Sequence, residues 1–154
     1  MYQRIMVPLD GSELAACVLP HVEAIAKGCN PEEIILVRVV EPLHMHGGEE
    51  YGIVQEERKK LEADSMDVAQ DYLKRIKRQL EDKGLMVKSA VIFGKAADEL
   101  VDYVKNNNID LVIIASHGRS GVSRWVWGSV ADRILRGVCV PVMIIRAPGC
   151  YPGI

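Results

Sequence analysis

The sequence predicts an α/β fold in which five parallel strands form one sheet with helices on both of its faces. Short apolar runs rich in β-branched residues alternate with longer segments whose apolar residues recur at helical spacing. Each helical segment joins two strands and is long enough for the crossover that parallel neighbours require. Because such crossovers are right-handed, the helices fall on both faces, which makes a three-layer α/β/α doubly wound sheet.

Length and composition indicate one domain of an ordinary globular protein. The 154 residues carry a formal net charge of −2 and are 49% hydrophobic. We expect a single domain over 1–147 and a flexible tail over 148–154. The charge gives no reason to expect nucleic acid as a partner, and no apolar run is long enough to span a membrane. The first residues enter a strand directly, so we expect no signal peptide and a cytoplasmic location.

The four cysteines lack the paired spacing of zinc or redox motifs. In a reducing compartment we expect them to be free thiols. Cys17 and Cys139 have apolar neighbours and are predicted to lie in the core, whereas Cys150 is the predicted exposed thiol.

The chain opens with a predicted strand over 4–9, in which Pro8 marks the carboxyl end because it has no N–H to donate. Residues 10–12 (DGS) follow as a tight turn, with Ser12 as the N-cap of a helix over 13–28. Pro20 is expected to bend this helix and Gly28 to end it. By composition alone, Asp10 is a turn residue that caps its own loop.

The middle of the chain predicts a strand over 34–41, a mobile surface loop over 42–57 and a long helix over 56–83 that ends at Gly84. His44 and His46 lie in this loop without a third ligand at metal spacing, so no metal site is predicted. The apolar seam of the long helix consists of Leu61, Ala69, Leu73, Ile76 and Leu80. A strand over 85–93 has a polar middle, which is typical of a sheet edge.

The last third predicts a helix from 94–97 to 106–108, a buried strand over 111–114, a helix from Gly128–Ser129 to Gly137, and a strand over 140–146. Between the buried strand and its helix lies a glycine-containing loop. In the same loop, Arg119 and Arg124 either neutralise phosphate charge or are solvated cations. Trp125 and Trp127 are expected to be buried or to pack in a dimer.

The stretch 110–130 therefore runs from a strand through a glycine-containing loop to a helix start. Gly118 and Gly121 allow close approach of the backbone to a ligand, and a helix start presents free N–H groups to an anion. Ser129 adds a hydroxyl donor. In a parallel sheet, ligands bind at this carboxyl edge. The residues alone leave two interpretations open, a phosphate site or a simple turn.

The same stretch resembles the nucleotide-binding motif of the universal stress proteins, G-x2-G-x9-G-[ST]. Ala115 stands in place of the first glycine, and Gly118, Gly128 and Ser129 match. The resemblance continues in residues 7–12 (VPLDGS), 94–97 (GKAA) and 141–146 (PVMIIR), so it extends over nearly the whole chain.

This resemblance implies a Rossmann-like fold of the adenine nucleotide alpha hydrolase type, with strand order 3-2-1-4-5. That order places the switch point between the first and fourth strands, beside Asp10 and Gly118. The resemblance also implies a homodimer in which the fifth strands pair across a two-fold axis. Such pairing covers an apolar edge that would otherwise favour aggregation.

The resemblance further implies a stress-response protein that binds ATP, with Mg²⁺ or Mn²⁺ accompanying the phosphates. Asp10 and the main chain of Val39 contact the adenosine, and the glycine loop holds ribose and phosphates. The implied binding residues are Pro8, Asp10, Val39, Ala115, Gly118, Gly121, Gly128, Ser129 and Val130. The Ala115 methyl group either obstructs the ligand or is absorbed by a small shift. A positive φ there costs about 1 kcal/mol.

Efficient catalysis is not predicted. The chain has no P-loop lysine motif and no candidate base with an orienting partner. Slow ATP hydrolysis or autophosphorylation stays open. The alternative functions are a dimeric interaction module of the same family that binds no nucleotide, and an AMP-utilising enzyme of related fold, for which the sequence has no signature.

Overall fold

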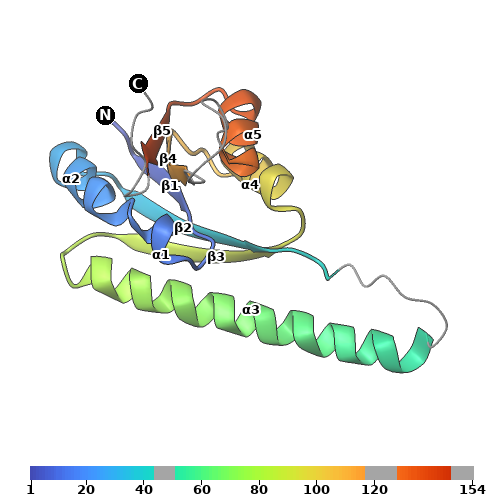
Figure 1. Ribbon diagram of the computed structural model, residues 1–154. Coiled ribbons are helices and arrows are strands. Elements are labelled where there is room, and N and C mark those ends of the chain that lie inside the picture. The colour runs from blue at the N-terminus through green and yellow to red at the C-terminus, as the bar shows by residue number, and fades with distance from the viewer. Residues whose placement is uncertain (44–50, 117–127, 147–154) are drawn as a thin grey trace, which may run out of the picture.

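A computed structural model of the chain describes residues 1–43, 51–116 and 128–146 (Figure 1). The described strands form one five-stranded sheet in which every neighbouring pair is parallel and the order is β3-β2-β1-β4-β5. The strands are β1 (Arg4–Pro8), β2 (Glu33–Val40), β3 (Val87–Phe93), β4 (Leu111–Ser116) and β5 (Val142–Arg146). This confirms the predicted fold class and strand order.

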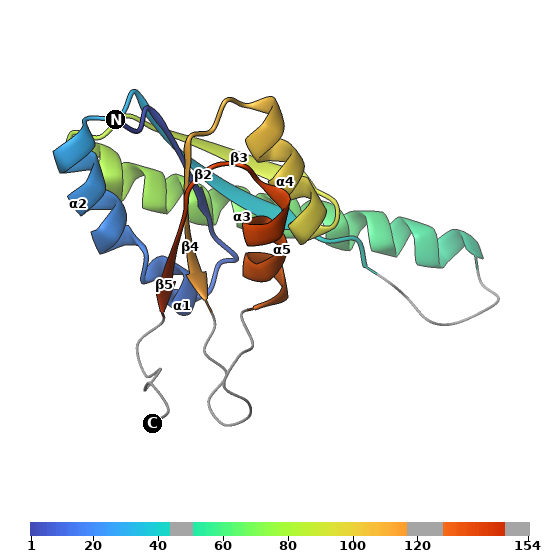
Figure 2. The same ribbon diagram turned by 90° about the horizontal axis from the view of Figure 1, so that it is seen from above.

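The helices cover both faces of the sheet, as Figures 1 and 2 show from two directions. They are α1 (Glu13–Ala16), α2 (Leu19–Cys29), α3 (Tyr51–Glu81), α4 (Ala96–Asn106) and α5 (Ser129–Gly137). Ile5 and Val7 pack in the core shared with α1, α2 and α3, whereas Met6 packs in the core shared with α4 and α5. Because strand side chains alternate between faces, β1 contributes to both cores and is buried almost throughout.

The sheet has a buried centre and a more exposed edge. All six residues of β4 are buried, whereas Lys88 and Ser89 of β3 are exposed. β3 pairs only with β2 among the described strands, so its predicted place at an edge is confirmed. The direction of chain progression reverses between β1 and β4, which makes their carboxyl ends the switch point of the sheet.

The single helix predicted over 13–28 is wrong, because the structure contains two helices with a break after Ala16. Pro20 lies in the first turn of α2, where a missing N–H leaves no bond unmade. Pro20 therefore lies at the start of a helix, whereas we expected it to bend one. Gly28 does not end it either: Asn30 is the C-cap, with φ 47°, and its N–H donates to the carbonyl of Ala26.

Helix α3 begins at Tyr51, so the loop predicted over 42–57 is shorter than expected. The carboxyl half of α3 packs on the sheet through Ala69, Leu73, Ile76 and Leu80, as predicted, but Leu61 is 49% exposed. Figures 1 and 2 show the amino end of α3 projecting beyond the rest of the molecule. Gly84, with φ 82°, follows the helix end as predicted.

The cysteines follow the prediction only in part. Cys17 is partly buried and packs on the core, but Cys139 is exposed, since β5 begins at Val142 and Cys139 lies in the turn before it. Cys150 lies outside the described residues. Within the described ranges, no helix combines the length and the apolar character needed to cross a membrane.

Candidate functional site

The candidate site lies at the carboxyl edge of the sheet. Pro8 is the last residue of β1 and is in register with Val37 of β2. Leu9 then donates its N–H to the carbonyl of Val37 at 2.9 Å, which extends the contact one residue beyond the strand. The chain leaves the sheet here, so Asp10 is placed at the rim, where it is exposed.

Asp10 organises the turn that begins α1. Its Oδ1 accepts hydrogen bonds from the backbone N–H of Ser12 at 2.8 Å and from the Ser12 hydroxyl at 2.6 Å. The Ser12 Oγ in turn accepts from the N–H of Ala15 at 3.0 Å, which confirms Ser12 as the predicted N-cap. The turn role of Asp10 is therefore real, and it holds the carboxylate at a fixed place on the rim.

Gly11 lets this turn lie directly against a side chain of β2. Its φ is +90°, a region that residues with a Cβ rarely adopt. A Cβ at this position would lie 2.8 Å from Nη1 of Arg38. The glycine thus permits close packing between the turn after β1 and the guanidinium group of Arg38.

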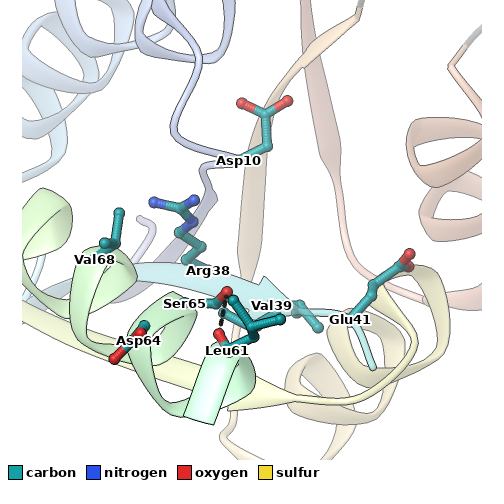
Figure 3. A pocket seen from close by; sticks show the side chains of 9 residues that line it. Asp10, Arg38, Val39, Glu41, Leu61, Asp64, Ser65 and Val68 are labelled. Atoms are coloured by element: carbon teal, nitrogen blue, oxygen red, sulfur yellow. Dashed lines mark hydrogen bonds between the residues drawn. The ribbon is translucent and has the colours of Figure 1, made fainter. Parts of the chain in front are cut away.

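A pocket of about 410 Å³ opens beside this turn (Figure 3). Its lining comes from the turn after β1, the carboxyl end of β2 and one face of α3, namely Asp10, Arg38, Val39, Val40, Glu41, Leu61, Asp64, Ser65 and Val68. The structure thus brings together two of the predicted site residues, Asp10 and Val39. The four lining residues of α3 were not predicted, because α3 is distant in sequence and has no motif that marks it as a pocket wall.

Arg38 is the only cation among the described lining residues, and its guanidinium group packs against an aromatic ring. Its guanidinium carbon lies 5.4 Å from the centre of the Tyr72 ring of α3, within the range of a cation–π contact. Arg75 lies 5.6 Å from the same ring. Burial, and then the charge of Asp10, raise the pKa of Tyr72, while Arg38 and Arg75 act in the opposite direction. Tyr72 therefore stays protonated and neutral at physiological pH.

The segment that leaves β2 is tied to both helix layers. Glu41 accepts a hydrogen bond from the N–H of Ala96 at 3.0 Å, which caps the start of α4. Leu43 donates its N–H to Glu62 of α3 at 3.3 Å, and Glu62 also pairs with Arg58. Hydrogen bonds to α3 and to α4 therefore hold the backbone that directly follows Val39 and Val40.

Ala115 lies in β4 opposite Ile145 of β5 and is 7% exposed. Its side chain belongs to the core cluster on the α1 and α2 face. Among the described non-glycine residues, only Asn30 and Asn108 have a positive φ, so the backbone strain considered for Ala115 does not arise.

Three other predicted site residues lie at the start of α5 and are not among the residues that line the pocket. Gly128 is the N-cap of α5, Ser129 is its first residue, and Val130 packs on the core beneath the helix. This confirms the predicted helix start. The described residues contain no group of three side chains suited to hold a metal ion. Several predicted features lie outside the described residues, namely Gly118, Gly121, Arg119, Arg124, Trp125, Trp127 and the histidines 44 and 46.

Comparison with known proteins identifies the family. The model of the universal stress protein family matches residues 1–146. Universal stress protein MJ0577 of Methanocaldococcus jannaschii is 28% identical, over 95% of this chain and 96% of that protein.

Solved structures agree with this assignment. A structure of MJ0577 superposes with a TM-score of 0.80 at 29% identity, covering 97% of this chain and 99% of that one. A universal stress protein family member from Arabidopsis thaliana with AMP bound shares the fold, with a TM-score of 0.64 at 16% identity and coverage of 96% and 93%. By sequence and by fold, the chain belongs to the universal stress protein family.

Proposed function

We propose that this chain is an ATP-binding universal stress protein, a cytoplasmic nucleotide-dependent switch in stress response with at most slow ATP hydrolysis or autophosphorylation. The observation that carries the proposal is the pocket at the carboxyl end of β2, which Asp10 and Val39 both line. The family resemblance in the sequence implies the same two residues as the contacts to adenosine. A pocket at the carboxyl edge is where a doubly wound sheet binds its ligand.

In this proposal the adenosine end is held by Asp10 and Val39. The carboxylate of Asp10 accepts hydrogen bonds from ribose hydroxyl groups, and it is already oriented by Ser12. The main chain of Val39 offers a donor and an acceptor to the edge of the adenine ring. Pro8 is the last residue of β1 and Ala115 is the last but one of β4, so both lie toward the carboxyl edge on which the pocket opens.

The phosphates are assigned to the start of α5, together with Gly118 and Gly121. The first backbone N–H groups of a helix lack partners within it and attract anions. Gly128 has no side chain in front of these groups, and Ser129 and Val130 supply the next two N–H groups. Mg²⁺ or Mn²⁺ then binds to phosphate oxygens, because these hard cations prefer oxygen ligands and Mg²⁺ is commonly held in part by substrate phosphates.

Relatives of the same fold support an adenine nucleotide as the ligand. One universal stress protein structure is a complex with cAMP, and the Arabidopsis thaliana structure contains AMP. These ligands share the adenosine group that the pocket is proposed to hold.

A titration of the purified protein with ATP tests the proposal. Isothermal titration calorimetry is expected to show binding to the wild-type chain, and ATP at one hundred times its Kd is expected to stabilise the fold by about 2.7 kcal/mol. No heat of binding and no rise in Tm at millimolar ATP would contradict the proposal and favour the interaction module that binds no nucleotide.

Exchange of Asp10 tests the assigned residue. Asp10→Asn keeps an oxygen that accepts from Ser12 but removes the charge, so the turn is expected to survive while ATP affinity falls several-fold. Glu13→Gln is the matched control, because it removes the same charge at an exposed position in the first turn of α1 that does not line the pocket, so its ATP affinity is expected to equal that of the wild type. Unchanged ATP affinity in Asp10→Asn would remove Asp10 from the site.

A further inference from the structure

Nearly half of the pocket lining comes from a helix to which no binding role has been assigned. Four of the nine lining residues lie on α3, namely Leu61, Asp64, Ser65 and Val68. Asp64, Ser65 and Val68 follow Leu61 by three, four and seven residues, so the four side chains form one stripe along the helix. Figure 3 shows this stripe across the pocket from Asp10 and next to Arg38 and Val39.

This stripe exposes large apolar side chains on a helix that is otherwise highly charged. Leu61 is 49% exposed and Val68 is 62% exposed. The packed part of α3 begins at Ala69, which is fully buried, so the stripe lies just before the helix meets the core. Neither side chain gains much stability from burial in the free protein, but each offers apolar surface to an occupant of the pocket.

The charges of the lining exclude some occupants. Asp10, Glu41 and Asp64 contribute three carboxylates, and Arg38 contributes one guanidinium, which lies over Tyr72. A polyphosphate placed here would meet a net negative lining and be repelled. A neutral, flat and apolar group with hydroxyl groups at one end fits the same lining, because apolar surface faces its rings and carboxylates accept from its hydroxyls.

The α3 stripe also supplies a polar atom. The hydroxyl of Ser65 donates to the carbonyl of Leu61 at 2.7 Å, so its proton is used in a hydrogen bond within the helix. The Oγ lone pairs are acceptors, which suit a hydroxyl or amino donor of a ligand and not a phosphate oxygen.

We propose that the α3 stripe, Leu61–Asp64–Ser65–Val68, is the second wall of the nucleotide site and selects the nucleoside end of the ligand. The base lies between Val39 and the apolar side chains Leu61 and Val68, and the acidic rim directs the phosphates out of the pocket toward the start of α5. This inference rests on the proposed ATP binding and adds to it the orientation of the ligand and the α3 residues that contact the base.

Calorimetric titration with ATP and with adenosine tests the wall. Leu61→Asp and Val68→Asp each add a carboxylate where the base is proposed to lie, so the affinities for both ligands are expected to fall at least tenfold. Gln70→Asp is the matched control, because it makes the same charge change at an exposed position of α3 outside the pocket lining, and its affinities are expected to equal those of the wild type.

The orientation is tested by methyl NMR of the wild-type protein. Adenosine alone is expected to shift the methyl resonances of Leu61 and Val68, and tripolyphosphate alone is expected to leave them unchanged. Shifts caused by tripolyphosphate would overturn the orientation.

The two proposals fail in different ways. If the wild type binds ATP and both aspartate variants bind it equally well, the α3 wall is wrong and the proposed function stands. If the wild type binds neither ATP nor adenosine, the proposed function fails and the wall fails with it. Thermal unfolding of all variants identifies any that have lost the fold; for such a variant, Leu61→Ser or Val68→Ser provides the same comparison without an added charge.

Discussion

At the scale of single residues, Ala115 shows how burial decides the meaning of a departure from a motif. The family pattern has a glycine where this chain has alanine. In the structure, the methyl group belongs to the core cluster that includes Leu9 and Ala15, and the backbone is that of an ordinary strand. Alanine at this position therefore contributes buried apolar surface and removes the backbone freedom that glycine would have in the unfolded chain.

Ala115→Gly is expected to destabilise the protein by about 1–2 kcal/mol, because it removes one buried methyl group and adds a flexible residue to a strand. ATP affinity is expected to stay within twofold of the wild type. Urea unfolding and calorimetry measure the two quantities. A gain of tenfold or more in ATP affinity would show that the methyl group obstructs the ligand.

Gly11, in contrast to Ala115, is a residue whose backbone conformation favours glycine. Its φ of +90° favours glycine, and a Cβ at this position would lie 2.8 Å from Nη1 of Arg38, so the guanidinium group would have to move. A larger residue would strain the backbone and displace the guanidinium that lies over Tyr72. Glycine here positions the only described cation of the pocket lining.

At the scale of elements, the amino edge of the sheet is tied by charged groups. Glu33 of β2 pairs with Arg4 of β1 at 2.9 Å and with Lys88 of β3. The carboxylate of Asp110, just before β4, accepts from the N–H groups of Gln3 and Arg4 at 2.7 and 3.0 Å. Four neighbouring strands are thus connected at the end opposite the candidate site.

The charge of Glu33 makes this connection dependent on pH. Burial raises the pKa of the Glu33 carboxyl, but the hydrogen bonds and charges of Lys88 and Arg4 outweigh burial, so its pKa lies below the ordinary value of 4.5. A carboxyl whose pKa is lowered by folding stabilises the fold above its unfolded pKa, and this stabilisation is lost as the pH falls through the folded pKa.

Glu33→Gln is expected to lower the free energy of unfolding at pH 7, and the difference from the wild type is expected to shrink as the pH is lowered below the ordinary value of 4.5. Urea unfolding at a series of pH values measures it. Glu32→Gln serves as the control, because Glu32 is exposed and its variant is expected to unfold like the wild type at every pH. A difference that grows in acid would contradict the assigned ion pairs.

Helix α3 shows how one element serves two purposes along its length. Leu73 and Leu80 are buried at 0% and 1% exposure, whereas Leu61 and Val68 are exposed beside the pocket. The carboxyl half therefore anchors the helix by apolar burial. The stripe before it stays exposed and lines the pocket.

At the scale of the whole molecule, β5 is an edge strand within the described sheet, paired only with β4. Val112 of β4 donates its N–H to the carbonyl of Pro141 at 3.0 Å. Since backbone groups alternate in direction along a strand, residues 143 and 145 face β4 as well, and residues 142, 144 and 146 present their N–H and C=O groups outward. Within the described sheet this edge has no partner strand, which supports the proposed homodimer through strand five.

Gel filtration is expected to give a mass of about 34 kDa, twice the 17.1 kDa of one chain. Met143 of β5 is 37% exposed, and Met143→Lys is expected to shift the mass toward one subunit, because edge lysines oppose strand pairing. Met143→Leu is the control and is expected to elute like the wild type. A wild-type chain that elutes as one subunit would exclude this dimer at the concentration used.

The sequence by itself determined the parts of this protein that depend on local pattern. Apolar periodicity predicted the order of strands and helices, Ser12 was predicted as an N-cap, and Gly128–Ser129 was predicted as a helix start, because each of these depends on residues close together in the chain. The strand order came from the family resemblance and was confirmed.

Tertiary structure alone decided which residues meet. Helix α3 forms a wall opposite Val39, Arg38 lies between Gly11 and Tyr72, and Leu61 of the predicted core seam stays exposed. The same helix packs on the sheet at Leu73 and lines a pocket at Leu61, and helical spacing is identical in both places. The two parts of the helix differ because β2 ends beneath α3. This contact joins segments that are distant in the sequence, so local periodicity does not predict it.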